Sequence, residues 1–535
     1  MIAVAFASGD DDDGDGDGAG GPGGGAGDGS ATGGVDEGDP VPGGILRVGI
    51  EAPRSFDPAT ASPVSPSELL AADLLFDGLT GVDAEGQPRP AIAASWEPSA
   101  DLRTWRFVLR PDARFADGSE IVAEDVKYSI ERVVRQGAAS LVAVRLETVS
   151  GYDDFVKGDT PNLPGLQVVD DRTFDVILDN PQAALPQLLA NPAFGIVPRE
   201  AVESTEEGAV PFGEAPVTSG PFSFSGGDAT VARLVRAGAD TALLDGIDLF
   251  LYDDLSEAYD DFVAGDLDWT LLPATRSAAA AERFGTDGFA PFQAELFYGF
   301  NLKSPTFADP RFRRAVVAAV DRDAVVNAVF AGSAEPLEGV VPAGVRRGDA
   351  GPCEAVCGYD PDLARALLSE AFPGGGAPEV RIDYYEGPSE DAVAGILESS
   401  LEAVGIPVTR RPLPFEEYQS FAVSGDQELF RLGWIGTSPS PDAYLSPLFS
   451  TGSPDNATGF SDPVVQGLLD QAAATADAGD RLDQFAQAEQ VILGHAPILP
   501  IAQFRTRAVV DDDVRGLELT VGGTFAGERV WLQRE

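Results

Sequence analysis

The chain has 535 residues, 44% of them hydrophobic, and a formal net charge of −51 from 36 basic and 87 acidic side chains. Such a length exceeds what one hydrophobic core holds and predicts roughly two to four packing units. The acidic excess argues against a nucleic-acid ligand, because a polyanion is repelled by a surface without a basic stripe.

The N-terminal segment has the composition expected of an export signal followed by a tether. Residues 1–7, MIAVAFA, end in the small-x-small pattern of a signal-peptide cleavage site. Residues 9–44 are almost wholly Gly, Asp, Ala, Pro and Ser, which cannot bury enough apolar area to fold. We therefore expect a signal remnant and a disordered acidic tether over residues 1–43, and a location outside the cytoplasm, in the periplasm or at the cell surface.

Strands and helices alternate after residue 44. Residues 105–110, WRFVLR, alternate apolar and polar side chains and predict a strand. Asp117-Gly118 predicts a tight turn, and residues 120–134 carry the apolar stripe of a helix.

Two Asp-Pro pairs mark helix starts. Asp309 as N-cap with Pro310 at the first helical position predicts one helix that ends before Gly332. Asp360-Pro361 repeats this signal ahead of DLARALLSEAF.

A β-α-β unit follows. The strands are expected at residues 379–385 and 406–413, with a helix from about Glu390 to Val404 between them, which implies a parallel sheet. Helices over residues 462–477 and 480–493 and a strand over 497–504 complete a large α/β protein of more than one lobe.

The chemistry-bearing residues are few. Cys353 and Cys357 are the only cysteines, and their turn-rich surroundings favour a disulfide over half of a zinc site. His495 is the only histidine and is better placed for capping or packing than for catalysis. No catalytic residue, metal site or cofactor is indicated, although paired carboxylates remain conceivable among so many acids.

Several segments, in order, resemble the extracytoplasmic solute-binding proteins of ABC importers, in the oligopeptide/dipeptide/nickel-binding family (family 5). The long run from LLFDGLTG to SIERV is similar to the N-terminal signature of that family. The other segments that carry the resemblance are GGILRVG, SFDPAT, TSGPFSF, FYGFNLKSPTFADPRFRRAVVAAVDRDAVV, YDPDLARALL, the loop beginning Gly433-Trp434, and AEQVILGHAPILPI.

The resemblance implies a two-lobed, periplasmic-binding-protein-like α/β fold with an extra subdomain inserted in the first lobe. Hinges would lie near Tyr298 and Pro497, and the ligand between the lobes. The expected ranges are 44–297 for the first lobe with 70–200 as the inserted subdomain, 298–495 for the second lobe, and 496–535 for the return to the first.

The resemblance also implies ligand-binding residues. Trp434 would line the cleft from residues 433–449, a segment whose three prolines predict neither helix nor strand for long. Many peptide-binding members carry Asp where this chain has Thr437, which puts recognition of a free N-terminus in doubt. Asp442 could replace that carboxylate, or it could cap a helix or turn. Further candidates by family position are Tyr298, Asn301 and Phe56.

We expect a monomeric, non-enzymatic receptor that captures a peptide or similar-sized polar solute and delivers it to an ABC importer permease. Alternatives are a receptor for an oligosaccharide or metal chelate, an exported carboxylate-dependent hydrolase, and a surface adhesion module. If Trp434 lines the cleft, Trp434→Ala should weaken binding far more than it lowers the melting temperature of the empty protein.

Overall fold

The computed structural model describes residues 40–533, apart from gaps at 84–85, 138–139, 207–210, 240, 287, 331, 347–351 and 354–355. The predicted signal remnant and almost all of the predicted tether lie outside the described residues. No helix in the described part of the chain is long and apolar enough to cross a membrane.

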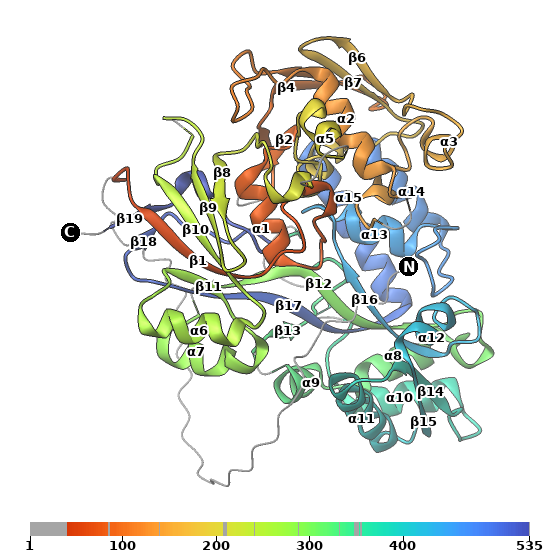
Figure 1. The fold of residues 1–535 in the computed structure, drawn as a ribbon. Helices are drawn as coiled ribbons and strands as arrows, with labels where there is room; N and C mark the ends of the chain where they lie inside the picture. The colour runs from red at the N-terminus through yellow and green to blue at the C-terminus, as the bar shows by residue number, and fades with distance from the viewer. Residues whose placement is uncertain are drawn as a thin grey trace.

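A long mixed sheet runs through the centre of the molecule (Figure 1). Its strands are β1 Ile45–Glu51, β8 Phe222–Gly227, β9 Val231–Arg236, β10 Gly246–Tyr252, β11 Trp269–Leu271, β12 Phe289–Phe300, β13 Ala334–Pro336, β14 Val380–Tyr385, β15 Val408–Leu413, β16 Leu429–Ile435 and β17 Ile498–Val510. Within the described residues the order is β15-β14-β16-β12-β17-β11-β1-β10-β9-β8, and β13 also pairs with β17. The long antiparallel strands β12 and β17 join the two halves of the sheet.

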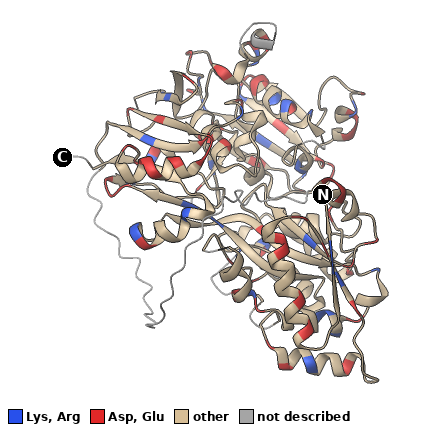
Figure 2. Ribbon diagram, turned by 60° about the horizontal axis from the view of Figure 1, so that its bottom comes forward, with Lys and Arg blue, Asp and Glu red and all other residues tan. Residues whose placement is uncertain are grey.

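Helices lie beside both halves of the sheet (Figure 1). Their bounds are α1 Pro66–Leu75, α2 Ala123–Val134, α3 Tyr152–Val156, α4 Leu185–Leu188, α5 Arg199–Glu206, α6 Leu255–Ala264, α7 Ser277–Phe284, α8 Pro310–Ala319, α9 Arg322–Val329, α10 Pro361–Ala371, α11 Pro388–Ala403, α12 Phe415–Phe421, α13 Asp442–Phe449, α14 Pro463–Ala473 and α15 Ala478–His495. Acidic residues recur on helices throughout the molecule, with Lys and Arg residues among them (Figure 2).

The first lobe is built on β1, which pairs in parallel with β10 and β11. Helix α1 packs its apolar side chains onto this half of the sheet. Ser65 caps the helix by accepting a hydrogen bond from the backbone N–H of Glu68, which fixes the start of the helix at Pro66. The C-terminal residues 514–532 return to the same hydrophobic cluster.

A separate cluster of buried apolar side chains, from Leu79 to Ile196, forms the inserted subdomain. It contains the antiparallel sheet β4-β5-β7-β6, with β4 Ala93–Pro98, β5 Thr104–Leu109, β6 Leu166–Asp170 and β7 Thr173–Ile177. A short hairpin of β2 Thr80–Val82 and β3 Pro88–Pro90 precedes it. The alternating burial of β5 and the helix α2 confirm the predictions for residues 105–110 and 120–134.

The second lobe contains the predicted β-α-β unit. Strand β14 pairs in parallel with β15, and α11 connects them. The single helix predicted after Asp309 is wrong, because the chain forms α8 and α9 with a break at Val320. Asp321 is the N-cap of α9 and accepts a hydrogen bond from the backbone N–H of Ala324, so a second cap inside the apolar pattern restarts the helix.

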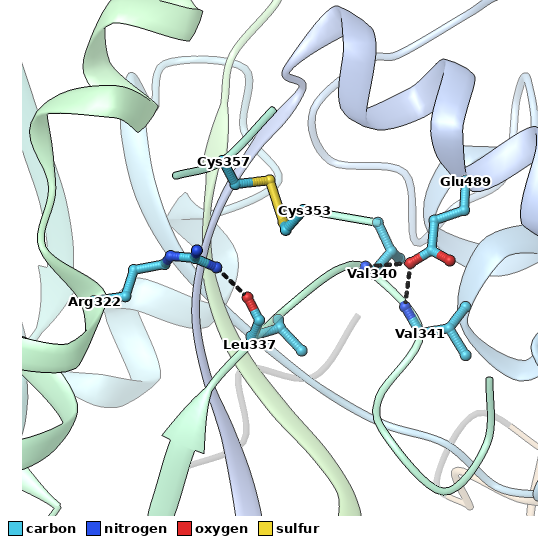
Figure 3. Close-up of a disulfide and its surroundings, with 7 residues drawn as sticks. All are labelled: Arg322, Leu337, Val340, Val341, Cys353, Cys357 and Glu489. Carbon is cyan, nitrogen blue, oxygen red and sulfur yellow. Dashed lines mark hydrogen bonds between the residues drawn. A yellow bond between two sulfur atoms is a disulfide. The ribbon is translucent and has the colours of Figure 1, made fainter. Parts of the chain in front are cut away.

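Cys353 and Cys357 form a disulfide, the pairing that the sequence favours over a metal site (Figure 3). Both are almost fully buried in the hydrophobic cluster of the second lobe. Nearby, the carboxylate of Glu489 on α15 accepts hydrogen bonds from the backbone N–H groups of Val340 and Val341, at 2.6 and 2.8 Å. These bonds hold the irregular segment after β13 against the lobe.

Candidate functional site

A cavity of about 820 Å³ lies between the inserted subdomain and the second lobe. One wall is formed by residues 140–148 and 180–188 of the inserted subdomain. The other wall is formed by the end of β16, by α13 and the segment after it, and by parts of α14 and α15. Binding pockets for small molecules usually enclose about 300–1,000 Å³, so the cavity is large enough to surround a small solute.

The segment from residue 433 to 449 is more regular than its prolines predict. Strand β16 continues through Ile435, and α13 begins at Asp442 and contains Pro447. Proline cannot donate to the carbonyl four residues before it, which here belongs to Ala443. That carbonyl instead accepts a hydrogen bond of 2.7 Å from the indole Nε1–H of Trp434. The helix thus tolerates its proline, and the same bond fixes the indole.

Trp434 belongs both to the cavity wall and to the core. It lines the cavity, but only 7% of its surface is exposed and it packs in the second-lobe cluster. The guanidinium of Arg145 lies 5.0 Å from the ring centre and forms an ion pair of 3.1 Å with Asp455. An arginine from the inserted subdomain therefore covers the indole of the second lobe through a cation–π contact.

Thr437 and Asp442 both line the cavity. Thr437 is 4% exposed, and its backbone carbonyl accepts a hydrogen bond of 2.9 Å from the amide of Asn191 in the inserted subdomain. The side chain of Asp442 makes no helix-capping bond. It accepts a 2.6 Å hydrogen bond from the hydroxyl of Ser446. Asp442 therefore presents a carboxyl group to the cavity within the first turn of α13.

Burial raises the pKa of the Asp442 carboxyl, while its bond to Ser446 and the charges of Arg145 and Arg481 act in the opposite direction. Arg481 on α15 also lines the cavity. It donates two hydrogen bonds to the carbonyls that follow α14, and burial lowers its pKa. The second-lobe wall thus holds charges of both signs close together.

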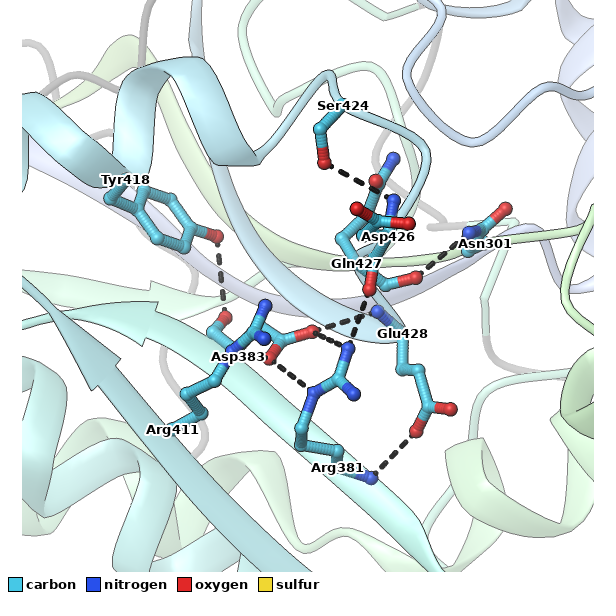
Figure 4. A network of polar contacts seen from close by, with 9 residues as sticks. All are labelled: Asn301, Arg381, Asp383, Arg411, Tyr418, Ser424, Asp426, Gln427 and Glu428. Carbon is cyan, nitrogen blue, oxygen red and sulfur yellow. Dashed lines mark hydrogen bonds and ion pairs between the residues drawn. The ribbon is translucent and has the colours of Figure 1, made fainter.

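The structure does not bring Tyr298, Asn301 or Phe56 to this cavity, and their role in ligand binding stays a prediction. Tyr298 points from β12 into the core with no exposed surface. The side-chain amide of Asn301 donates to the carbonyls of Gly425 and Gln427, at 2.9 and 2.8 Å, and so fixes a turn (Figure 4).

Phe56 packs against Phe224 of the first lobe, with ring centres 5.6 Å apart. Conversely, sequence reasoning did not identify Arg145 or Arg481, which belong to no local motif. Only the folded chain brings Arg145 to a tryptophan almost three hundred residues away.

Relatives share this architecture. The chain is 27% identical to "Periplasmic oligopeptide-binding protein OppA" of Escherichia coli over 86% of this chain and 87% of that protein. It is 28% identical to "Probable deoxycholate-binding periplasmic protein YgiS" of Escherichia coli over 83% and 86%. Among solved structures, the unliganded open form of the periplasmic murein tripeptide-binding protein MppA superposes with a TM-score of 0.80 at 24% identity, covering 91% and 97%.

The two-lobed fold with an inserted subdomain is therefore that of the periplasmic binding proteins. Residues 87–456, more than half of the chain, match the sequence model of the bacterial extracellular solute-binding proteins, family 5. The chain belongs to this family of extracytoplasmic solute-binding proteins of ABC importers.

Proposed function

We propose that this protein captures a peptide, or a polar solute of similar size, in the cavity between the inserted subdomain and the second lobe and delivers it to a membrane permease. The observation that carries the proposal is one cavity of about 820 Å³ whose walls come from two separate bodies, each with its own hydrophobic cluster. A solute held there contacts both bodies at once, so its binding favours the arrangement in which they approach each other.

Contacts across the cavity support such coupling. Besides the Arg145–Asp455 ion pair, the backbone N–H of Ala183 donates to the carbonyl of Ala473 at 3.0 Å. The amide of Asn191 reaches the carbonyl of Thr437. These polar contacts join the two walls, and polar contacts of this kind are typical of bodies that move relative to one another.

A zwitterionic solute suits the charges of the walls. Asp442 offers a carboxyl for an ammonium group, and Arg145 and Arg481 offer guanidinium groups for a carboxylate. We propose that Asp442 replaces the carboxylate that Thr437 lacks. The names of several relatives, such as the oligopeptide-binding protein of Escherichia coli, accord with a peptide.

A non-peptide polar solute is the second candidate. Thr437 supplies no formal charge, and its carbonyl already accepts the amide of Asn191. Recognition of a free peptide N-terminus therefore depends on Asp442 alone in this loop. A receptor that binds sugars or chelates, but no peptide, is the result that favours this candidate.

The test is a thermal-shift screen of di- to hexapeptides, oligosaccharides and chelated metals, followed by calorimetric titration. A true ligand at 100-fold excess over its Kd stabilises the protein by about 2.7 kcal/mol. Trp434→Phe should weaken binding by about tenfold. Trp531→Phe is the matched control, because Trp531 is as buried as Trp434 but lies outside the cavity.

The proposal is contradicted if the screen finds no solute that stabilises the protein. It is also contradicted if both tryptophan variants lose affinity equally. Turnover of the peptide or glycan, followed by mass spectrometry, would instead favour the hydrolase. We further propose that the protein acts as a monomer, with an N-terminal tether and with lobe boundaries near residues 298 and 495. Light scattering and limited proteolysis test these points.

A further inference from the structure

A second, smaller cavity of about 110 Å³ shares Thr437 and Ser438 with the first. It lies where α1, the hairpin of β2 and β3, and residues 520–528 of the first lobe meet the loop after β16. A space of this size admits one compact chemical group rather than a whole solute.

The lining of this cavity carries an excess of negative charge. It contains four carboxyl side chains, Asp73, Asp77, Asp83 and Glu528. Among its described lining residues Arg89 is the one cation, and it is engaged with Glu528 at 2.9 Å. Asp77 forms an ion pair of 3.6 Å with Arg110 outside the lining, whereas Asp73 and Asp83 form no ion pair within the described residues.

Two glutamine amides in the same lining have no partner. Gln187 and Gln293 are 6% and 5% exposed, and neither side-chain amide hydrogen bonds to any part of the chain that the structure describes. The Nε2 atom of Gln293 lies 3.9 Å from where a Cβ on Gly522, another lining residue, would stand. Because neither amide is engaged by the described chain, both are free to bind a ligand in the cavity.

The pKa values of two of these carboxyls are raised. Burial, with the charge of Glu528, raises the pKa of Asp73 to about 7, and burial raises the pKa of Asp77 to about 6. Glu528 and Arg89 act on both aspartates, Thr524 and Asp77 act on Asp73, and Arg110 acts on Asp77. A bound cation would lower both pKa values.

The geometry favours an organic cation over a metal ion. Within the described residues, no three His, Cys, Asp or Glu side chains converge closely enough to hold a metal. We propose that this cavity binds a guanidinium or primary ammonium group between the carboxyls of Asp73 and Asp77 and the two glutamine amides. Such a group donates several N–H bonds in different directions, which suits acceptors spread around one space.

The first experiment uses methylguanidinium, with methylurea as its neutral isostere, and measures binding by calorimetry. The wild-type protein should bind methylguanidinium and not methylurea. Asp73→Asn should weaken binding by about tenfold, since a charged partner becomes neutral. Asp112→Asn is the control, because Asp112 is exposed and outside the lining, and it should bind as the wild type does.

Binding should also fall by about tenfold from pH 8 to pH 5.5, because protons compete for the aspartates. Gln293→Leu provides a second variant in case Asp73→Asn folds poorly. It should lower affinity for methylguanidinium while keeping or raising the melting temperature. Absence of wild-type binding, or unchanged affinity in both variants, overturns the inference.

A second arm identifies where the cation comes from, and only this arm rests on the proposed function. Ala-Arg-Ala is compared with Ala-citrulline-Ala. A preference for the arginine peptide that Asp73→Asn abolishes means that the captured solute supplies the cation. Equal binding of both peptides, with methylguanidinium still bound, means a free cation. If neither peptide binds, the proposed peptide ligand fails, and the methylguanidinium result still decides the inference.

Discussion

Asp383 and Glu295 are both fully buried carboxyls of the second lobe's sheet, yet their surroundings are opposite. Asp383 on β14 pairs with Arg381 at 2.7 Å and Arg411 at 2.9 Å and accepts the backbone N–H of Glu428 (Figure 4). Glu295 on β12 has no hydrogen-bond partner for either carboxyl oxygen within the described chain.

Asp383 lies in a region that only supports the fold, whereas Glu295 lies at the junction between the lobes. The carboxylate of Asp383 is paired with two arginines, so its charge needs no ligand to offset it. Glu295 lies directly opposite Trp434 in the pairing of β12 and β16, and Gln293 is two residues away on the same strand. Glu295 is therefore an uncompensated carboxyl next to Trp434, a residue that lines the larger cavity.

The largest loss of stability is expected from removing the carboxylate of Asp383, which is paired with two arginines. Asp383→Ala leaves two arginines without their shared partner and should lower the free energy of unfolding by about 4 kcal/mol. Urea denaturation measures this. Asp362→Ala, which removes an exposed pair with Arg365, is the control and should cost less than about 1 kcal/mol. Equal losses would mean that burial does not distinguish the two pairs.

Trp434→Ala should lower both stability and affinity. A loss of stability is expected beside the loss of affinity, because the indole is 7% exposed and donates to the carbonyl of Ala443. We expect a loss of about 3 kcal/mol in stability, from the cavity that forms, and at least about tenfold in affinity. Stability loss with unchanged affinity would assign Trp434 to the core alone.

A smaller effect is expected from the disulfide. Cys353→Ser with Cys357→Ser removes a very short covalent loop, and the chain-entropy argument gives about 2 kcal/mol at most. Ligand affinity should not change, since neither cysteine lines a cavity. Altered affinity would show that the segment after β13 takes part in binding.

The smallest effect on stability is expected at Glu295, whose carboxyl has no partner, and this effect depends on pH. Burial raises the pKa of Glu295 well above its usual value, with a further contribution from Glu489. A raised folded-state pKa means that its stability contribution is complete below about pH 4.3 and is lost as pH rises through the folded value.

Glu295→Gln should therefore stabilise the protein relative to the wild type by about 1 kcal/mol more at pH 8.5 than at pH 5. Urea denaturation at the two pH values measures this difference. Glu402→Gln, at an exposed position, should show no such change. A wild-type pH slope that survives in Glu295→Gln would locate the titrating group elsewhere.

Periodic segments with clear boundaries could be predicted from the sequence. The β-α-β unit of β14, α11 and β15 and the capped helix α10 are examples, because each pattern is local. The break between α8 and α9 was missed because an apolar stripe continues across Asp321. Helix α13 was missed because its proline is tolerated only through a hydrogen bond from Trp434 that the local sequence does not reveal.

The candidate site was partly predictable for the same reason. Trp434, Thr437 and Asp442 come from one segment and do line the cavity. Tyr298, Asn301 and Phe56 were placed by family position, and the structure does not bring them to the cavity. Arg145 and the two unpartnered glutamines acquire their meaning only from tertiary neighbours far away in the chain.

The most direct test of the central claim is a crystal structure of the protein with the tightest solute from the screen. The account predicts one solute molecule between the inserted subdomain and the second lobe, in contact with Trp434 and with Asp442 or Arg145. A solute bound outside this space, or a complex in which the cavity stays empty, would contradict it.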